Sequence, residues 1–236
     1  MLQSVNREND VRNSCTLNKA IADCFEKLTD EELLLLEENH VVLTYKKGEN
    51  LCKQGSMASH IMYICCGLVK IYMENENNSL ILKVLPGGNM IGLTALLEGS
   101  SVFKYSAMAY QECKVRLIDI NAFKKVISQN SAFAKEVINI LCENLIQTQT
   151  RFFSYTQKQS YGKLADTLIC LSCNIFKCEV LELNLTRKEL AELTGLTPES
   201  VIRILSKFKA DNIILMEGKT IQIIDMSKLK MISDYG

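Results

Sequence analysis

The sequence predicts an α+β chain, in which an N-terminal β-roll of the double-stranded β-helix or jelly-roll type is followed by a long helix and a winged helix-turn-helix. Three observations support this prediction. Residues 41–120 form short alternating stretches separated by glycines, residues 134–155 follow a heptad repeat, and residues 186–223 combine two capped helices with a hairpin pattern.

Length and composition allow two modest domains. The chain has 236 residues, 47% of them hydrophobic, and a formal net charge of zero, so any basic surface for nucleic acid must be local. No glycine-rich phosphate loop, HExxH motif or obvious catalytic triad is present in the sequence, so we expect no enzyme. We expect four segments: an N-terminal arm and helix start at 1–28, a β-roll at 29–130, a dimerisation helix at 131–156 and a winged helix-turn-helix domain at 157–236.

The N-terminus and the longest apolar run both indicate a soluble, cytoplasmic protein without a membrane partner. Residues 1–10 lack the apolar core of a secretory signal, and the run at 61–69 is too short to span a membrane. Because the cytoplasm keeps thiols reduced, the ten cysteines are expected to be core residues, metal ligands or redox sensors and not disulfide partners.

The first 130 residues read as a polar arm, a helix, a set of strands and a short second helix. Thr29 and Glu32 form a capping box for a helix that ends near residue 39. Turns about every dozen residues are typical of a sandwich or roll, which encloses a pocket near its middle. The strands are expected at 41–45, 60–73, 80–85 and 105–120, and the short helix at 121–129.

A long helix with Ser131 as its expected N-cap carries a heptad seam. A single helix with such a seam needs a partner, which a second copy of the chain would supply, or else it packs wholly against its own roll. Thr148, the polar residue of the seam, would fix the register or face a ligand held between roll and helix. The seam residues are Ala134, Ile138, Leu141, Leu145, Thr148, Phe152 and Tyr155.

The stretch from Thr186 to Lys209 predicts a helix-turn-helix. Thr186 and Glu189 form a second capping box, Gly195 permits the sharp turn, and Thr197 caps the next helix. Only a short turn separates the two helices, which is typical of this motif.

The second of these helices has one apolar face and one free face. Its apolar stripe consists of Val201, Ile204, Leu205 and Phe208. If the helix lay in a major groove, Arg203 would donate to a guanine, Glu199 would accept from a cytosine, and Ile202 would pack on a thymine methyl. The alternative is a surface helical hairpin in which Glu199 and Arg203 form an i, i+4 salt bridge.

A hairpin pattern follows this helix. Residues 213–215 and 220–223 flank a turn that carries Lys219 at its tip. We expect Lys219, together with Ser200 and Lys207, to contact phosphates and set the register on DNA. This wing favours DNA binding over the plain helical hairpin.

The order of roll, dimerising helix and winged helix resembles the CRP/FNR superfamily of bacterial transcription regulators across essentially the whole chain, and the FNR-like branch more than the cyclic-AMP-binding members. The most specific match runs from Glu199–Arg203 through Gly218–Ile221, and 48–49, 67–71 and 90–92 look like the family's roll signatures. The resemblance implies a homodimer on an inverted-repeat operator in double-stranded DNA. It also implies RNA polymerase as a partner if the protein activates, and a small-molecule or redox effector sensed in a cyclic-nucleotide-binding-like roll.

The family's cyclic-AMP-binding residues are matched only in part. Those members hold the ribose with a Glu and the phosphate with an Arg-Ser pair, where this chain has Leu93 and Tyr105-Ser106. A buried phosphate without its arginine would be poorly compensated, so we do not expect cyclic AMP in that mode. The effector pocket implied by the resemblance comprises Gly92, Leu93, Tyr105, Ser106 and Thr148.

The oxygen-sensing members of the family carry an iron-sulfur cluster on cysteines. Cys15, Cys24 and Cys113 fall where three of the four ligands would be, and the fourth has no counterpart. The alternative is that Cys24 and Cys113 are small packing residues. Cys65 and Cys66 are adjacent in a strand, so we expect one inside and one outside.

The sequence therefore predicts a DNA-binding transcription regulator with an unassigned effector. Its two histidines, His40 and His60, lie at element edges as surface residues or as haem ligands. A second hypothesis is a ligand- or redox-responsive protein-binding module with vestigial DNA binding, which predicts no footprint on any inverted repeat. The free face with Glu199 and Arg203 argues against it.

Overall fold

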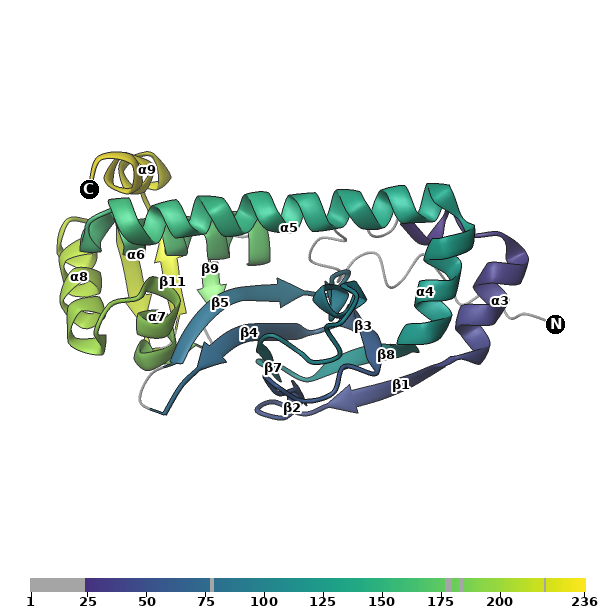
Figure 1. Cartoon of the computed structure of the whole chain (residues 1–236). Coiled ribbons are helices and arrows are strands. Elements are labelled where there is room, and N and C mark those ends of the chain that lie inside the picture. Colours follow the sequence, from purple (N-terminus) through teal and green to yellow (C-terminus); the bar gives the residue numbers. More distant parts are fainter. Residues whose placement is uncertain (1–23, 77–78, 177–179, 183–184, 219) are drawn as a thin grey trace. The chain divides into compact units, whose positions relative to one another are not determined.

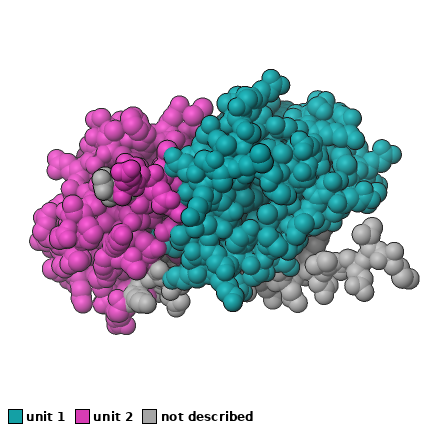
Figure 2. All heavy atoms as spheres, turned by 60° about the horizontal axis from the view of Figure 1, so that its bottom comes forward, with its two compact units in different colours: residues 1–69, 85–142 teal, residues 70–84, 143–236 magenta. Residues whose placement is uncertain are grey.

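The computed structural model describes residues 24–76, 79–176, 180–182, 185–218 and 220–236 (Figure 1). The chain forms two compact units (Figure 2), one built from residues 1–69 and 85–142 and the other from residues 70–84 and 143–236. The described elements confirm the predicted α+β class, with a β-rich N-terminal part, a long helix and a C-terminal helix-turn-helix. Within the described ranges, no helix is both long and apolar enough to cross a membrane.

Two four-stranded sheets form the β-roll, with strand orders β1-β8-β3-β6 and β2-β7-β4-β5. The central pair is β3 and β8, whose antiparallel register sets Ile61 opposite Ile118 and Ile64 opposite Val115. These four side chains are buried and anchor the core of the first sheet. The strands are β1 (His40–Tyr45), β2 (Asn50–Cys52), β3 (His60–Cys66), β4 (Leu68–Glu74), β5 (Ser79–Pro86), β6 (Met90–Ile91), β7 (Ser106–Ala109) and β8 (Cys113–Asp119).

Two of the predicted strands are each broken into two. Gly67, with a φ of 94°, separates β3 from β4, and a Cβ there would collide with the backbone oxygen of Glu112. The amides of Tyr110 and Gln111 both donate to the Leu68 oxygen, and this turn separates β7 from β8. The single strands predicted at 60–73 and 105–120 were therefore wrong in their extent.

The pairing of β3 with β8 also shifts in register between Ile64 and Cys66. A bulge breaks the strict alternation of side chains across a strand. Cys65 and Cys66 are both exposed as a result, so the expectation that one of them points inward was wrong.

The helices of the first unit begin at clear capping residues. α3 (Asp30–Glu38) has the predicted capping box of Thr29 and Glu32, and α4 (Ile120–Gln129) is capped by the Asp119 carboxylate. A short 3-10 turn, η1 (Leu93–Leu96), follows β6.

The long helix α5 (Ser131–Gln157) starts where the sequence predicted, with a different cap. The Phe133 amide donates to the Asn130 side-chain oxygen over 2.9 Å, so Asn130 and not Ser131 fills the capping role. Asn130 also donates to the Lys27 oxygen and to the Glu32 carboxylate. These three hydrogen bonds hold the Asn130 side chain in place, which explains why Asn130 and not the neighbouring Ser131 caps the helix.

The second unit contains the winged helix-turn-helix. α6 (Ser160–Cys170) packs closely against α9 (Met226–Tyr235), where Gly162 leaves no room for a side chain beside the Gly236 carbonyl. A short π-helical segment, η2 (Leu171–Phe176), continues α6. The remaining elements are β9 (Val180–Glu182), α7 (Arg187–Thr194), α8 (Pro198–Ala210), β10 (Ile214–Glu217) and β11 (Thr220–Ile223), and the three strands form one sheet in the order β10-β11-β9.

Candidate nucleic-acid interface

The helix-turn-helix is built from local signals that the structure confirms. The Thr186 hydroxyl accepts from the Glu189 amide while the Glu189 carboxylate accepts from the Thr186 amide. Gly195 ends α7 in the left-handed conformation with a φ of 65°. The Thr197 hydroxyl then accepts from the Ser200 amide at the start of α8. Capping at both starts and a glycine in the turn therefore fix the direction of α8.

α8 presents a polar face to solvent. Its stripe of Val201, Ile204, Leu205 and Phe208 is buried, as predicted. Glu199, Ile202 and Arg203 are exposed on the opposite side, together with Ser206 and Lys207. An isoleucine that is 51% exposed in the middle of a packed domain is free to make an apolar contact with a partner.

Arg203 and Glu199 do not neutralise each other. In the part of the chain that the structure describes, no ion pair joins them, and the Arg203 guanidinium lies over the Tyr161 ring, 5.9 Å from its centroid. The Glu199 pKa is lowered because its own amide and the Thr197 hydroxyl donate to the carboxylate. The surface salt bridge of the alternative interpretation is therefore not formed.

The predicted phosphate contacts are only partly described. Ser200 is half-buried and receives a hydrogen bond from the Thr197 hydroxyl over 3.2 Å. Lys207 pairs with Asp211 over 3.1 Å, one helical turn away. The wing strands β10 and β11 pair as expected, with Glu217 opposite Thr220. Lys219, which lies between them in the sequence, is outside the described residues.

Sequence reasoning missed Tyr161 at the start of α6. Its ring meets Phe208 edge-on at 6.0 Å between centroids while also lying under Arg203. One aromatic ring thus connects the core side and the free side of α8. In the sequence, Tyr161 is marked only by its neighbour Gly162. Nothing there indicates a contact with Arg203, which lies 42 positions further along the chain.

Comparisons with known proteins agree with this geometry. A family model described as a cyclic nucleotide-binding domain matches residues 42–130, and one described as a Crp-like helix-turn-helix domain matches residues 162–232. The chain belongs to the CRP/FNR superfamily of bacterial transcription regulators. It is a DNA-binding transcription regulator.

Relatives from both branches of the superfamily match. The cAMP-activated global transcriptional regulator CRP of Salmonella typhimurium is 26% identical over 183 residues, 76% of this chain and 87% of that protein. The transcriptional activator protein Anr of Pseudomonas aeruginosa is 22% identical over 189 residues, 78% of this chain and 77% of that protein. The structure of FixK2 from Bradyrhizobium japonicum shares the fold with a TM-score of 0.74 at 19% identity, over 82% of this chain and 96% of that one.

The predicted dimer seam of this CRP/FNR regulator lies on the exposed side of α5. Ile138, Leu141, Leu145 and Phe152 are 58%, 37%, 57% and 68% exposed, and Thr148 is exposed as well. Ala134 is half-buried. Tyr155, the last seam residue, differs because its hydroxyl donates to the Leu193 oxygen over 2.5 Å within its own chain.

The predicted effector positions in the roll already have partners within the chain. The Gly92 amide donates to the Tyr105 hydroxyl over 2.9 Å, and the buried Ser106 hydroxyl accepts from the Gln54 amide over 3.0 Å. Leu93 is buried. Burial raises the Tyr105 pKa to about 12, so this hydroxyl stays protonated. Thr148 donates to the Asn144 oxygen of its own helix.

Eight of the thiols lie in the part of the chain that the structure describes, and all eight are free cysteines. Burial raises the pKa of Cys24 to about 12 and that of Cys113 to about 11, so both thiols are protonated in the chain without a metal. Cys15 lies outside the described residues. In the described ranges, no group of three or more His, Cys, Asp or Glu side chains is placed to hold a metal ion. Cys24 and Cys113 are both buried, as the alternative of packing residues requires.

A polar contact ties the helix-turn-helix to the hairpin of β4 and β5 within the second unit. The Leu193 oxygen at the end of α7 accepts from both Tyr155 and Arg151, over 2.5 and 2.7 Å. Arg151 also donates to the Ile81 oxygen of β5 over 3.4 Å, and the Tyr155 hydroxyl, whose one proton is directed at Leu193, lies 3.3 Å from the same oxygen. At the other end of α7, Lys70 of β4 pairs with Glu189 over 3.6 Å. We call the Arg151–Tyr155 pair with its two carbonyls the α7 latch.

Proposed function

We propose that two copies of this chain bind an inverted-repeat DNA operator, with α8 of each copy in a major groove. The observation that carries the proposal is the free face of α8, where Glu199, Ile202 and Arg203 stand exposed above a fully buried stripe. Arg203 would donate to a guanine, Glu199 would accept from a cytosine amino group, and Ile202 would pack on a thymine methyl. Ser200, Lys207 and Lys219 would contact phosphates and set the register.

The second copy is proposed because the seam of α5 is apolar and uncovered. Four large apolar side chains at heptad spacing are 37–68% exposed in a single chain, and burying the exposed part of each would contribute roughly 1 kcal/mol. Pairing α5 with its copy would place two reading helices about one helical turn, ~34 Å, apart, which requires an operator with two-fold symmetry.

The proposed signal acts through the roll and is not cyclic AMP in the mode of its relatives. The Tyr105 hydroxyl accepts a hydrogen bond from the Gly92 amide. Leu93 and Tyr105 occupy the positions where the family's carboxylate and guanidinium would be. The effector remains a small molecule or a redox signal, and an activator would also contact RNA polymerase. The α7 latch offers a route by which the hairpin of β4 and β5 could bias the position of α7.

Footprinting on the inverted repeats upstream of its own gene tests the proposal. The full chain should protect both half-sites together, and Leu145→Asp should abolish protection because a charge enters each side of the seam. Leu97→Asp, which changes a leucine that is 69% exposed outside the seam, is the control and should protect like the parent protein. The absence of any protected inverted repeat would instead support the protein-binding module with vestigial DNA binding.

A further inference from the structure

The strand β1 is an unprotected sheet edge. It pairs with β8 along all six of its residues, and no described strand pairs with its other side. Figure 1 draws β1 at the outer margin of its sheet. Such an edge presents unpaired backbone groups, and natural proteins usually protect it with charges, prolines or bulges. The sequence HVVLTY contains no proline and no lysine, arginine or carboxylate, and its pairing with β8 has no register shift.

Three consecutive apolar side chains of β1 are exposed, so both faces of the strand carry apolar groups in water. Val41, Val42 and Leu43 are 56%, 38% and 42% exposed. Exposed apolar residues on a free strand edge are the two features that β-strand addition uses, with the backbone providing affinity and alternate side chains providing specificity. β1 is therefore suited to accept another strand.

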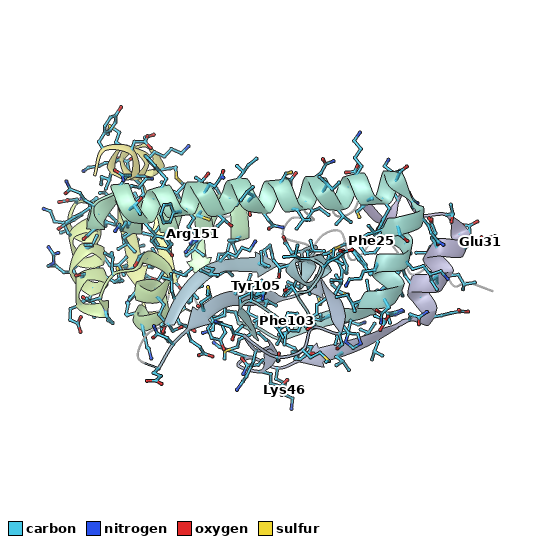
Figure 3. All side chains as sticks on the ribbon, viewed as in Figure 1. Phe25, Glu31, Lys46, Phe103, Tyr105 and Arg151 are labelled. Atoms are coloured by element: carbon cyan, nitrogen blue, oxygen red, sulfur yellow. The ribbon has the colours of Figure 1, made fainter. Side chains whose placement is uncertain are left out.

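The charges that flank β1 are opposite in sign at its two ends. Glu37 and Glu38 precede it at the end of α3, and Lys46 and Lys47 follow it. Figure 3 labels Lys46 just beyond the end of β1. Glu38 and Lys47 are exposed, and in the described part of the chain neither forms an ion pair.

From these observations we infer that β1 pairs antiparallel with β1 of a second copy of this chain. In a two-fold antiparallel pair, opposite residues share a face of the sheet, so residue numbers of the same parity must face each other. With Val42 on the two-fold axis, Val41 lies opposite Leu43 and His40 lies opposite Thr44. The same register brings the Glu38 end of each copy next to Lys46 and Lys47 of the other.

The pairing of β1 with its copy is a second two-fold contact, separate from the α5 seam of the proposed function. Two different two-fold contacts on one chain generate assemblies larger than a dimer. On an operator, such contacts would let neighbouring sites be occupied together. The pairing of β1 uses only residues of the first unit and requires no effector.

The mass of the full-length protein over a wide range of concentration tests the inference. Light scattering should show species heavier than a dimer at high concentration, and Val42→Lys should remove them because two like charges would meet on the two-fold axis. Leu97→Lys, at an apolar position that is more exposed than Val42 and lies away from β1, should behave as the parent protein does. Equal masses for Val42→Lys and the parent at every concentration would overturn the inference.

A charge exchange gives a second test. Glu38→Lys and Lys46→Glu should each weaken the heavier species, whereas the double variant should restore them, since each lysine would again face a glutamate. In the Leu145→Asp background, pairing of β1 alone should still give a dimer, and adding Val42→Lys should give a monomer. A failed seam and a failed β1 contact are thus told apart. Those amides of Val41–Leu43 that point away from β8 report on the edge. If they exchange slowly at the lowest concentration, the edge is covered within one chain, and the inference is overturned.

Discussion

At the scale of single residues, Arg203 is the proposed source of base specificity, and its surroundings leave it free for that role. Arg203→Ala should weaken binding to the matched operator by ~1–3 kcal/mol and relax the preference at one base pair. Lys219→Ala should weaken binding to all sequences alike, because a phosphate contact carries no base information. Gel shifts on matched and singly mismatched operators measure both. Equal losses on every sequence for Arg203→Ala would contradict the base-reading role.

Lys83 is a buried cation whose effect on stability depends on pH. Burial, with a smaller contribution from Arg151, lowers its pKa from 10.5 to about 8, and its ammonium donates to Asn144 over 2.6 Å. Between these values the unfolded chain binds the additional proton, so the free energy of unfolding should rise with pH from about 8 to 10.5. Lys83→Met should stabilise the protein at neutral pH by on the order of 1–3 kcal/mol, and the gain should shrink across that window.

Urea unfolding of Lys83→Met and the parent at a series of pH values checks this prediction. Taking the difference between the two proteins cancels the thiols and phenols that they share. The exposed Lys47→Met is the control and should show no gain at neutral pH. A stability difference that does not change with pH would mean that Lys83 acts through packing alone.

Residues that face outward on α8 could be predicted from the sequence, whereas their long-range partners could not. Val201 and Phe208 repeat at helical spacing, and burial of that stripe forces Glu199 and Arg203 outward. The contact of Arg203 with Tyr161 depends on how α6 packs, and the bond between Tyr105 and Gly92 depends on closure of the roll. Neither contact leaves a pattern in the local sequence.

At the scale of elements, caps and periodicity predicted helices better than they predicted strands. The capping boxes at Thr29 and Thr186 were confirmed, because each is a local pattern of hydroxyl and carboxylate. The strand predicted at 60–73 was wrong in its extent. The chain turns at Gly67, where the Glu112 backbone oxygen comes so close that a Cβ would collide with it, and this approach depends on a segment far away in the sequence. The cap of α5 moved to Asn130 for a similar reason, namely its contact with Glu32 of another helix.

The α7 latch makes a prediction at this scale. Tyr155→Phe removes one of two donors to the Leu193 oxygen, and because Arg151 still donates there, the loss of stability should stay within ~0.5–1.5 kcal/mol. Arg151→Ala together with Tyr155→Phe should lose less than the sum of the two single changes, because the hydrogen bonds from Arg151 to the Tyr155 hydroxyl are already lost in either single change. Denaturant unfolding measures the cycle. Tyr235→Phe, at a tyrosine that is 89% exposed, is the control, and simple additivity would argue against an energetic coupling between Arg151 and Tyr155.

At the scale of the whole molecule, the sequence predicted the order of roll, long helix and winged helix, because each part carries its own periodicity. The two compact units do not follow the predicted segments of the sequence. Residues 70–84, which belong to the hairpin of β4 and β5, are part of the same unit as residues 143–236. This grouping arises from contacts such as Lys70 with Glu189 and Ile81 with Arg151. Long-range pairs of this kind cannot be read from the spacing of residues along one segment.

Operator spacing gives the prediction for the proposed dimer. If the α5 seam fixes the two reading helices, inserting ~5 base pairs between half-sites should rotate one half-site to the opposite face of the duplex, since one turn takes about 10–10.5 base pairs. Affinity should then fall to that of a single half-site, and an insertion of a full turn should not rescue it, because the seam cannot lengthen. Gel shifts on this spacing series measure the effect. An isolated half-site is the control, and undiminished binding to all spacings would show that the two reading heads act independently of α5.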